Sequence, residues 1–156
     1  MTAATGLVTA FPSLSFGAAG KYDAMLLACI DPRFPEPTIR YMERHRMVGR
    51  YSQFTIAGAA IGVVAPAFKD WAKAFWDNLA ASIELHRITR VIAMDHRDCS
   101  AAKIAYGAEK VANPGIEIET HKAALMEFRK QASERHPKLA VETGLMALNG
   151  KVEMFS

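Results

Sequence analysis

Three side chains of this sequence are of the types that bind a transition metal. Cys29 ends a short apolar stretch, and His96 and Cys99 follow another with two residues between them. This spacing lets His96 and Cys99 reach a common point from one turn, and Cys29 would supply a third ligand from a neighbouring strand. Two thiolates and an imidazole are donors that zinc prefers, and three protein ligands leave a fourth tetrahedral position open for chemistry. The pattern predicts one catalytic Zn²⁺ per chain.

A carboxylate and a guanidinium stand beside the first of these cysteines. Asp31 lies two residues after Cys29, and Arg33 follows two residues later, so in an extended segment their side chains point the same way. Asp31 would either orient a zinc-bound water or bind the metal itself and close the fourth position. The bidentate fork of Arg33 would hold Asp31 away from the metal. We expect Asp31 and Arg33 to be catalytic residues.

Buried strands are predicted to carry these residues. Apolar stretches at 24–29 and 90–94 are typical of such strands. A further strand is expected over 51–57, around Phe54, Thr55 and Ile56. Helical patterns lie between and after these segments. This alternation indicates the α/β class: a mainly parallel four-stranded sheet covered by helices. Asn149-Gly150 predicts a closing hairpin over 139–155, which adds an antiparallel strand. Ligands in such a sheet bind beyond the carboxyl ends of the strands.

Helices are expected at 36–46, 67–86, 100–106 and 120–135, with loops at 58–66 and 113–115. The helix over 67–86 is predicted from an apolar stripe at spacings of three and four, formed by Phe68, Trp71, Ala72, Phe75, Leu79 and Ile83. The histidines outside the metal motif are expected to be exposed on or near helices; they are His45, His86, His121 and His136.

Composition limits the class of protein. The chain has 156 residues, of which 51% are hydrophobic and 22% charged, which suits one globular domain over 1–156 with an N-terminal arm at 1–20. The net charge is +3 and the basic residues are scattered, so we expect no nucleic-acid partner. No segment is long enough to span a membrane, and the apolar stretch at 5–17 is not typical of a signal peptide. We therefore expect a cytoplasmic protein. In a reducing compartment its two cysteines are more often metal ligands than partners in a disulfide.

Two motifs resemble those of the β-class carbonic anhydrases. The segment 29–33, Cys-Ile-Asp-Pro-Arg, resembles their Cys-x-Asp-x-Arg motif, and the segment 96–99, His-Arg-Asp-Cys, resembles their His-x-x-Cys motif. The separation of the motifs and the elements between them are also similar, and the resemblance covers roughly residues 24–155. Two complete motifs at the matching separation are a specific signal.

The resemblance implies a zinc enzyme that interconverts carbon dioxide and bicarbonate. Cys29, His96 and Cys99 would bind the metal, and a zinc-bound hydroxide would attack the carbon of the small-molecule substrate. It also implies a homodimer or higher homo-oligomer with active sites at the subunit interface.

Four positions depart from the family pattern. This chain has Pro32 where the family usually has Ser, Ile56 where it has Asn, and Asp95 and Ser100 where it has Gly. We expect Asp95 and Ser100 to narrow or repolarise the space where substrate sits. The apolar lining is expected near Phe34, Phe54 and residues 57–60.

Several alternatives stay open. The same zinc site could hydrolyse carbonyl sulfide or carbon disulfide, which are also small linear electrophiles. The protein could instead bind zinc without turnover, or sense oxidants through its thiolates. The two cysteines could also be plain core residues or form a disulfide, and Asp98 could serve only to cap the following helix.

Overall fold

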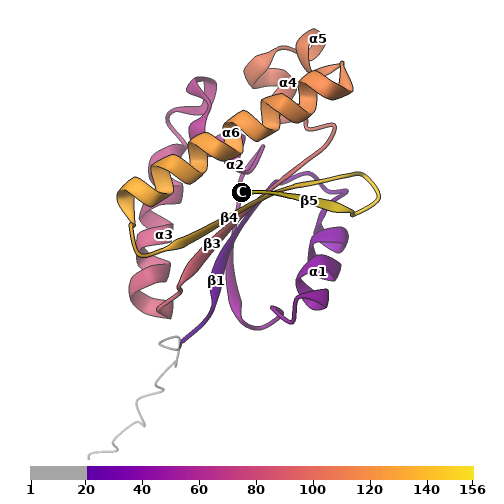
Figure 1. The fold of residues 1–156 in the computed structure, drawn as a ribbon. Helices are drawn as coiled ribbons and strands as arrows, with labels where there is room; N and C mark the ends of the chain where they lie inside the picture. Colours follow the sequence, from indigo (N-terminus) through magenta and orange to yellow (C-terminus); the bar gives the residue numbers. More distant parts are fainter. Residues whose placement is uncertain (1–20) are drawn as a thin grey trace, which may run out of the picture.

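The computed structural model describes residues 21–156, so the expected arm at 1–20 lies outside the described residues. A five-stranded sheet in the order β2-β1-β3-β4-β5 runs through the centre (Figure 1). The parallel strands are β1 (Ala24–Ala28), β2 (Tyr51–Thr55), β3 (Arg90–His96) and β4 (Ala140–Met146). The last strand, β5 (Val152–Phe155), is antiparallel to β4. The predicted α/β class with a closing antiparallel hairpin is confirmed.

Helices cover both faces of the sheet. One face carries α1 (Pro35–Arg44), and the other carries α2 (Ala60–Val64), α3 (Ala72–His86) and α6 (Pro114–Arg135) (Figure 1). The short helices α4 (Ser100–Tyr106) and α5 (Ala108–Val111) lie between β3 and α6 in the chain.

Two apolar clusters attach these helices to the sheet. Successive strand side chains point to opposite faces. Leu26 therefore packs with Met42 of α1, whereas Leu27 packs with Phe75 and Phe128 of α3 and α6. All five side chains are fully buried, and burial of each stabilises the fold by about 1.5–3 kcal/mol. The strand ends that precede the metal-binding motifs are thus held firmly from both sides.

Three segments differ from the sequence prediction. The loop expected at 58–66 contains the short helix α2. The helix expected over 67–86 begins only at Ala72, after a 3₁₀ turn (Pro66–Phe68). Trp71 consequently lies outside the helix, 39% exposed, with its ring stacked on Phe68. The loop expected at 113–115 is instead the start of α6, because Asn113 Oδ1 accepts hydrogen bonds from the N–H groups of the first turn.

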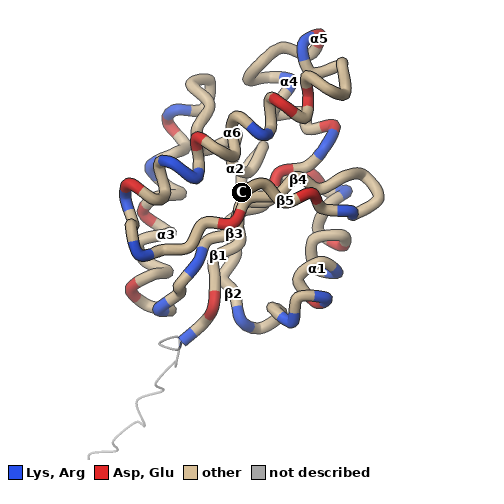
Figure 2. Tube along the Cα trace, in the orientation of Figure 1, with Lys and Arg blue, Asp and Glu red and all other residues tan. Residues whose placement is uncertain are grey.

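Charged residues of both signs are interspersed along the described chain (Figure 2). Between residues 21 and 156, no helix combines the length and the apolar character needed to cross a membrane.

Candidate metal centre

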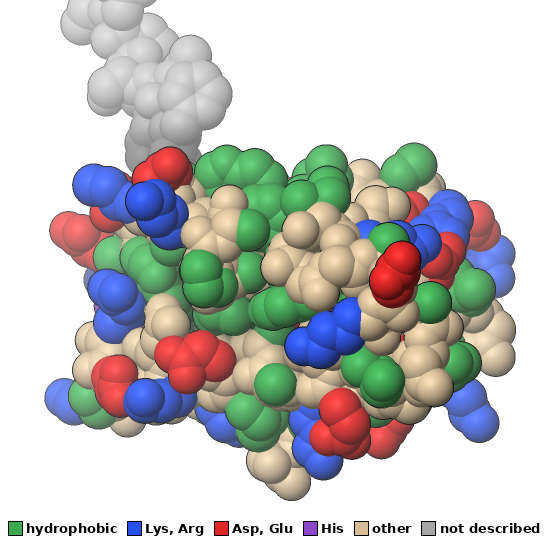
Figure 3. Space-filling model, turned by 90° about the horizontal axis from the view of Figure 1, so that it is seen from above, with side chains coloured by type: hydrophobic (Ala, Val, Ile, Leu, Met, Phe, Trp, Pro, Cys, Tyr) green, Lys and Arg blue, Asp and Glu red, His purple; other side chains and the backbone are tan. Residues whose placement is uncertain are grey.

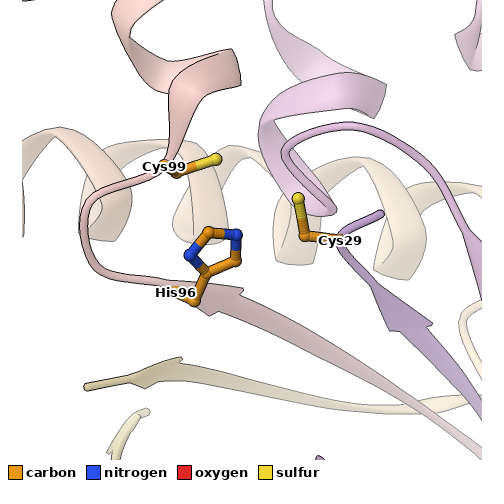
Figure 4. Close-up of side chains that lie close together, drawn as sticks. All are labelled: Cys29, His96 and Cys99. Atoms are coloured by element: carbon orange, nitrogen blue, oxygen red, sulfur yellow. The ribbon is translucent and has the colours of Figure 1, made fainter. Parts of the chain in front are cut away.

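The three predicted metal-binding side chains meet at the carboxyl end of the sheet. Cys29 directly follows β1, His96 ends the neighbouring parallel strand β3, and Cys99 stands at the start of α4. Figure 4 shows their side chains converging from these three elements. Their candidate ligand atoms all lie within 4.8 Å of one another, and both cysteines are free. A disulfide is therefore not part of this arrangement.

The imidazole of His96 is oriented for a metal. Its Nδ1 lies 2.9 Å from the carbonyl oxygen of Arg97, to which it donates, so Nε2 carries the lone pair. Nε2 is buried and has no hydrogen-bond partner among the described residues. Phe34 stacks on the ring with the centroids 3.9 Å apart and fixes its plane. A buried nitrogen without a partner is costly, and a metal ion bound with the two sulfurs would satisfy it. The residues present fit zinc.

The two thiols have very different proton affinities. The neighbouring Cys99, together with His96 and the backbone N–H of Gly58, lowers the pKa of Cys29 to about 4 in spite of burial. Gly58 N–H donates to Cys29 Sγ over 3.1 Å. The Cys29 sulfur and burial together raise the pKa of Cys99. One thiolate therefore exists in the metal-free site, and a bound cation would favour the second.

Asp31 and Arg33 form the predicted pair beside the cluster. Arg33 Nε and Nη2 donate to the two carboxylate oxygens of Asp31 over 3.0 and 2.7 Å, and Arg33 N–H donates to Oδ1 as well. These bonds lower the pKa of Asp31 to about 2. Asp31 Oδ2 lies 3.9 Å from His96 Nε2, so the carboxylate faces the cluster without joining it.

Asp98 has a role that sequence reasoning missed. It accepts hydrogen bonds from Arg33 Nη1 and from Lys103, and its carbonyl oxygen accepts one from Arg33 Nη2. The alternative that Asp98 serves only to cap α4 is not supported, because Cys99 holds the N-cap position and no side chain caps that helix. Asp98 has a positive φ of 56°, which orients it back toward Arg33. Its place inside the His-x-x-Cys motif was the only signal available from the sequence.

A largely apolar cavity of about 310 Å³ opens beside Cys29 and Asp31. Ser100 and Pro32 line it, as does Ala57 of the expected lining. The rest of the lining is formed by Ile30, Phe68, Trp71, Ala101 and Ile104. Phe34 and Phe54 do not line it, since one stacks on His96 and the other packs on Phe75 in the core. Residues 58–60 of the expected lining do not line it either.

Asp95 does not line this cavity, contrary to expectation. Its side chain is fully buried, pairs with His121 and accepts a hydrogen bond from Ala60 N–H. Burial raises the pKa of Asp95, although His121 and Ala60 oppose this effect. The prediction that His121 is exposed is therefore wrong, since its side chain has no exposed surface. An ionisable residue within an apolar strand was the signal that a buried partner existed.

Residues 19–132 match the family described as "Putative carbonic anhydrase", and the chain belongs to this family. All five residues of the two motifs lie within the match. The chain is 31% identical to an uncharacterized protein of Rickettsia conorii, over 83% of this chain and 69% of that protein. It is 30% identical to an uncharacterized protein of Rickettsia bellii, over 83% of this chain and 79% of that one.

Solved structures share the fold at low sequence identity. The β-carbonic anhydrase CcaA aligns with a TM-score of 0.55 at 13% identity, covering 88% of this chain and 80% of its own. A tetrameric β-carbonic anhydrase of Sordaria macrospora aligns with a TM-score of 0.54 at 15% identity, covering 90% and 84%. The protein therefore has a β-carbonic anhydrase-like fold that carries a Cys-His-Cys cluster.

Proposed function

We propose that the protein is a zinc-dependent carbonic anhydrase, which hydrates carbon dioxide reversibly to bicarbonate. The observation that carries this proposal is the convergence of Cys29, His96 and Cys99, with one unpaired buried nitrogen between two sulfurs. Three protein ligands are typical of catalytic zinc rather than structural zinc.

The chain's own groups prepare the metal-binding atoms. Gly58 N–H holds the thiolate of Cys29, and the Arg97 carbonyl holds His96 in the tautomer that presents Nε2. When bound, Zn²⁺ lowers the pKa of a coordinated water from about 15.7 to about 7 and so supplies a nucleophile at neutral pH.

Asp31 is placed to orient that nucleophile. Its carboxylate faces His96 Nε2 at 3.9 Å, and Arg33 keeps it ionised through bonds to both oxygens. An ionised carboxylate accepts a hydrogen bond and thereby directs the oxygen lone pair at the substrate. Since both oxygens already bind Arg33, the carboxylate is restrained from moving onto the metal. This arrangement favours an open fourth position and weakens the non-catalytic alternative.

The neighbouring cavity suits a small uncharged substrate. Ile30, Trp71 and Ile104 give it apolar walls, and Ser100 offers a single hydroxyl. Carbon dioxide needs no charged partner to bind, whereas the charged product is held poorly by such walls and leaves.

We further propose that the chain, as one domain, works as a homodimer or higher homo-oligomer. Ile30 and Ile104 at the cavity mouth are 62% and 72% exposed, which a second subunit would cover. Figure 3 shows hydrophobic side chains gathered in the middle of one face among charged ones. The Sordaria macrospora relatives with this fold are tetrameric.

The decisive test is stopped-flow hydration of carbon dioxide by zinc-loaded protein, with Asp31→Ala as the matched variant. Fast hydration that needs zinc and is lost in Asp31→Ala is the expected result. A zinc-loaded protein that does not hydrate carbon dioxide would contradict the proposal. Carbonyl sulfide and carbon disulfide are then the substrates to assay, because they are linear electrophiles of similar size.

A further inference from the structure

The buried pair of Asp95 and His121 adjoins the strand end that carries His96. Both side chains have no exposed surface, and His121 Nδ1 lies 2.8 Å from Asp95 Oδ2. Asp95 immediately precedes His96 in β3, whereas His121 comes from the middle of α6. The pair therefore connects a covering helix to the strand that delivers a metal ligand.

The other carboxylate oxygen of Asp95 holds a strained turn. Asp95 Oδ1 accepts a hydrogen bond from Ala60 N–H over 2.9 Å at the start of α2. The preceding residue, Ala59, has a positive φ of 48°, which is unfavourable for a residue with a side chain. Such a conformation persists only where the surroundings impose it. The α2 helix has no cap from its own N-cap side chain, so Asp95 supplies this stabilisation from β3.

The same turn carries a hydrogen bond to a metal-binding sulfur. Gly58, two residues before Ala60, has a φ of 81° and directs its N–H at Cys29 Sγ. A continuous set of contacts thus runs from His121 through Asp95 and the 58–60 turn to Cys29. On its other side, the backbone of Asp95 leads directly into His96.

The main structural consequence of this pair is that it orients the side chains of the metal centre. A buried pair of this kind often gives no more stability than apolar side chains of the same volume. Here all the polar atoms of the Asp95 side chain are used, one on the turn and one on His121. Outer hydrogen bonds of this kind fix the direction of metal ligands, and their loss typically weakens metal affinity by about 10–100-fold.

We propose that Asp95 and His121 are positioning residues of the metal centre, which hold the 58–60 turn so that Gly58 N–H meets Cys29 Sγ. The inference rests on the metal site of the proposed function, but not on the reaction carried out there.

The test compares zinc affinities, measured by competition with a chromophoric chelator. Asp95→Ala and His121→Leu remove the contact and should each weaken Zn²⁺ binding by about 10–100-fold. Asp95→Asn keeps an acceptor for Ala60 N–H and a donor for His121, and His121→Asn keeps a donor near the position of Nδ1, so both should restore most of the affinity. The double variant Asp95→Ala/His121→Leu should bind Zn²⁺ about as tightly as the single variant with the lower affinity, because the two residues act as one unit.

Phe128→Leu is the control for a loss of packing. Phe128 is fully buried on α6, two turns beyond His121, and packs on Phe75 and Trp76 away from the cluster. It should lower the melting temperature and leave zinc affinity within about 2-fold of the wild type. The Co²⁺-loaded proteins give a second readout, since the sulfur-to-cobalt absorption band should shift in Asp95→Ala and not in Phe128→Leu.

The outcomes separate the two proposals. If the wild type binds zinc and Asp95→Ala behaves as Phe128→Leu does in affinity and in the cobalt spectrum, the positioning role is overturned and the proposed function stands. If the wild type itself binds no zinc, both are overturned.

Discussion

Arg33 joins two loops of the metal centre that lie far apart in the sequence, since its Nη1 donates to Asp98 Oδ2 over 2.8 Å across 65 residues. Its Nη2 also donates to the Asp98 carbonyl oxygen over 3.0 Å, while the same guanidinium holds Asp31. The side chain of Arg33 therefore fixes the position of the Asp31 carboxylate and also that of the turn that leads to Cys99.

Removal of this guanidinium should uncouple zinc binding from activity. In Arg33→Ala we expect kcat/KM for carbon dioxide hydration to fall by about 100-fold, because the carboxylate of Asp31 is then misplaced or free to bind the metal. Zinc content should stay near one ion per chain. Arg33→Lys is the matched variant; it keeps the charge but not the fork, so most of the loss should remain. Hydration at the wild-type rate in Arg33→Ala would contradict this role.

Zinc content should distinguish the proposed metal ligands from the other histidines. Cys29→Ser and His96→Ala should each lose most of the zinc found by elemental analysis of the purified protein, because two protein ligands hold the ion weakly. His45→Ala is the control, since His45 is exposed and bonds to the carbonyl oxygen of Tyr41. Equal zinc content in His96→Ala and His45→Ala would remove His96 from the ligand set.

Metal removal should lower stability by mass action. Free zinc at about 100 times its dissociation constant stabilises the folded state by about 2.7 kcal/mol. We therefore expect a chelator to lower the melting temperature of the wild type, measured by calorimetry. The chelator should leave that of Cys99→Ala almost unchanged, because this variant has little zinc to lose. An equal shift in both proteins would indicate that the chelator acts elsewhere.

The turn beside Cys29 should tolerate no side chain at Gly58. A Cβ there would lie 2.9 Å from Ala101 Cβ, and the residue has a φ of 81°. Gly49 is a matched control, since its φ is 77° and a Cβ would meet nothing within 4 Å. Gly49→Ala should cost about 1–2 kcal/mol from backbone conformation alone. Gly58→Ala should lower the free energy of unfolding by about 1–3 kcal/mol more than Gly49→Ala does, because of overpacking. Urea unfolding measures both losses. Equal losses would mean that the turn can relax.

The cavity mouth should be part of the subunit interface. Ile104 is 72% exposed, so in a monomer Ile104→Glu should change stability by less than about 0.5 kcal/mol. In an oligomer it should cause dissociation, seen by analytical ultracentrifugation. Leu85→Glu is the control, because Leu85 is 56% exposed near the end of α3, before β3 begins, and so lies at the opposite end of that strand from His96. An oligomer unaffected by Ile104→Glu would place the interface elsewhere.

Local pattern was sufficient to predict the sheet and the three side chains that meet in the cluster. The buried strands are continuous apolar runs, and Cys29 and His96 lie at the ends of two of them. Parallel strands bring their carboxyl ends to one edge, so the meeting of these residues follows from topology. The start of α6 was missed, although Asn113 followed by Pro114 has the chemistry of an N-cap and first turn.

The sequence by itself thus determined the fold class and the side chains that meet at the cluster. Only the tertiary structure decided which distant groups hold them: Asp98 against Arg33, and His121 against Asp95. These contacts depend on how α6 and the loop after β3 are rotated and placed against the sheet. Helix periodicity shows which residues share a face, but the partner of a polar residue on that face is set by packing between elements.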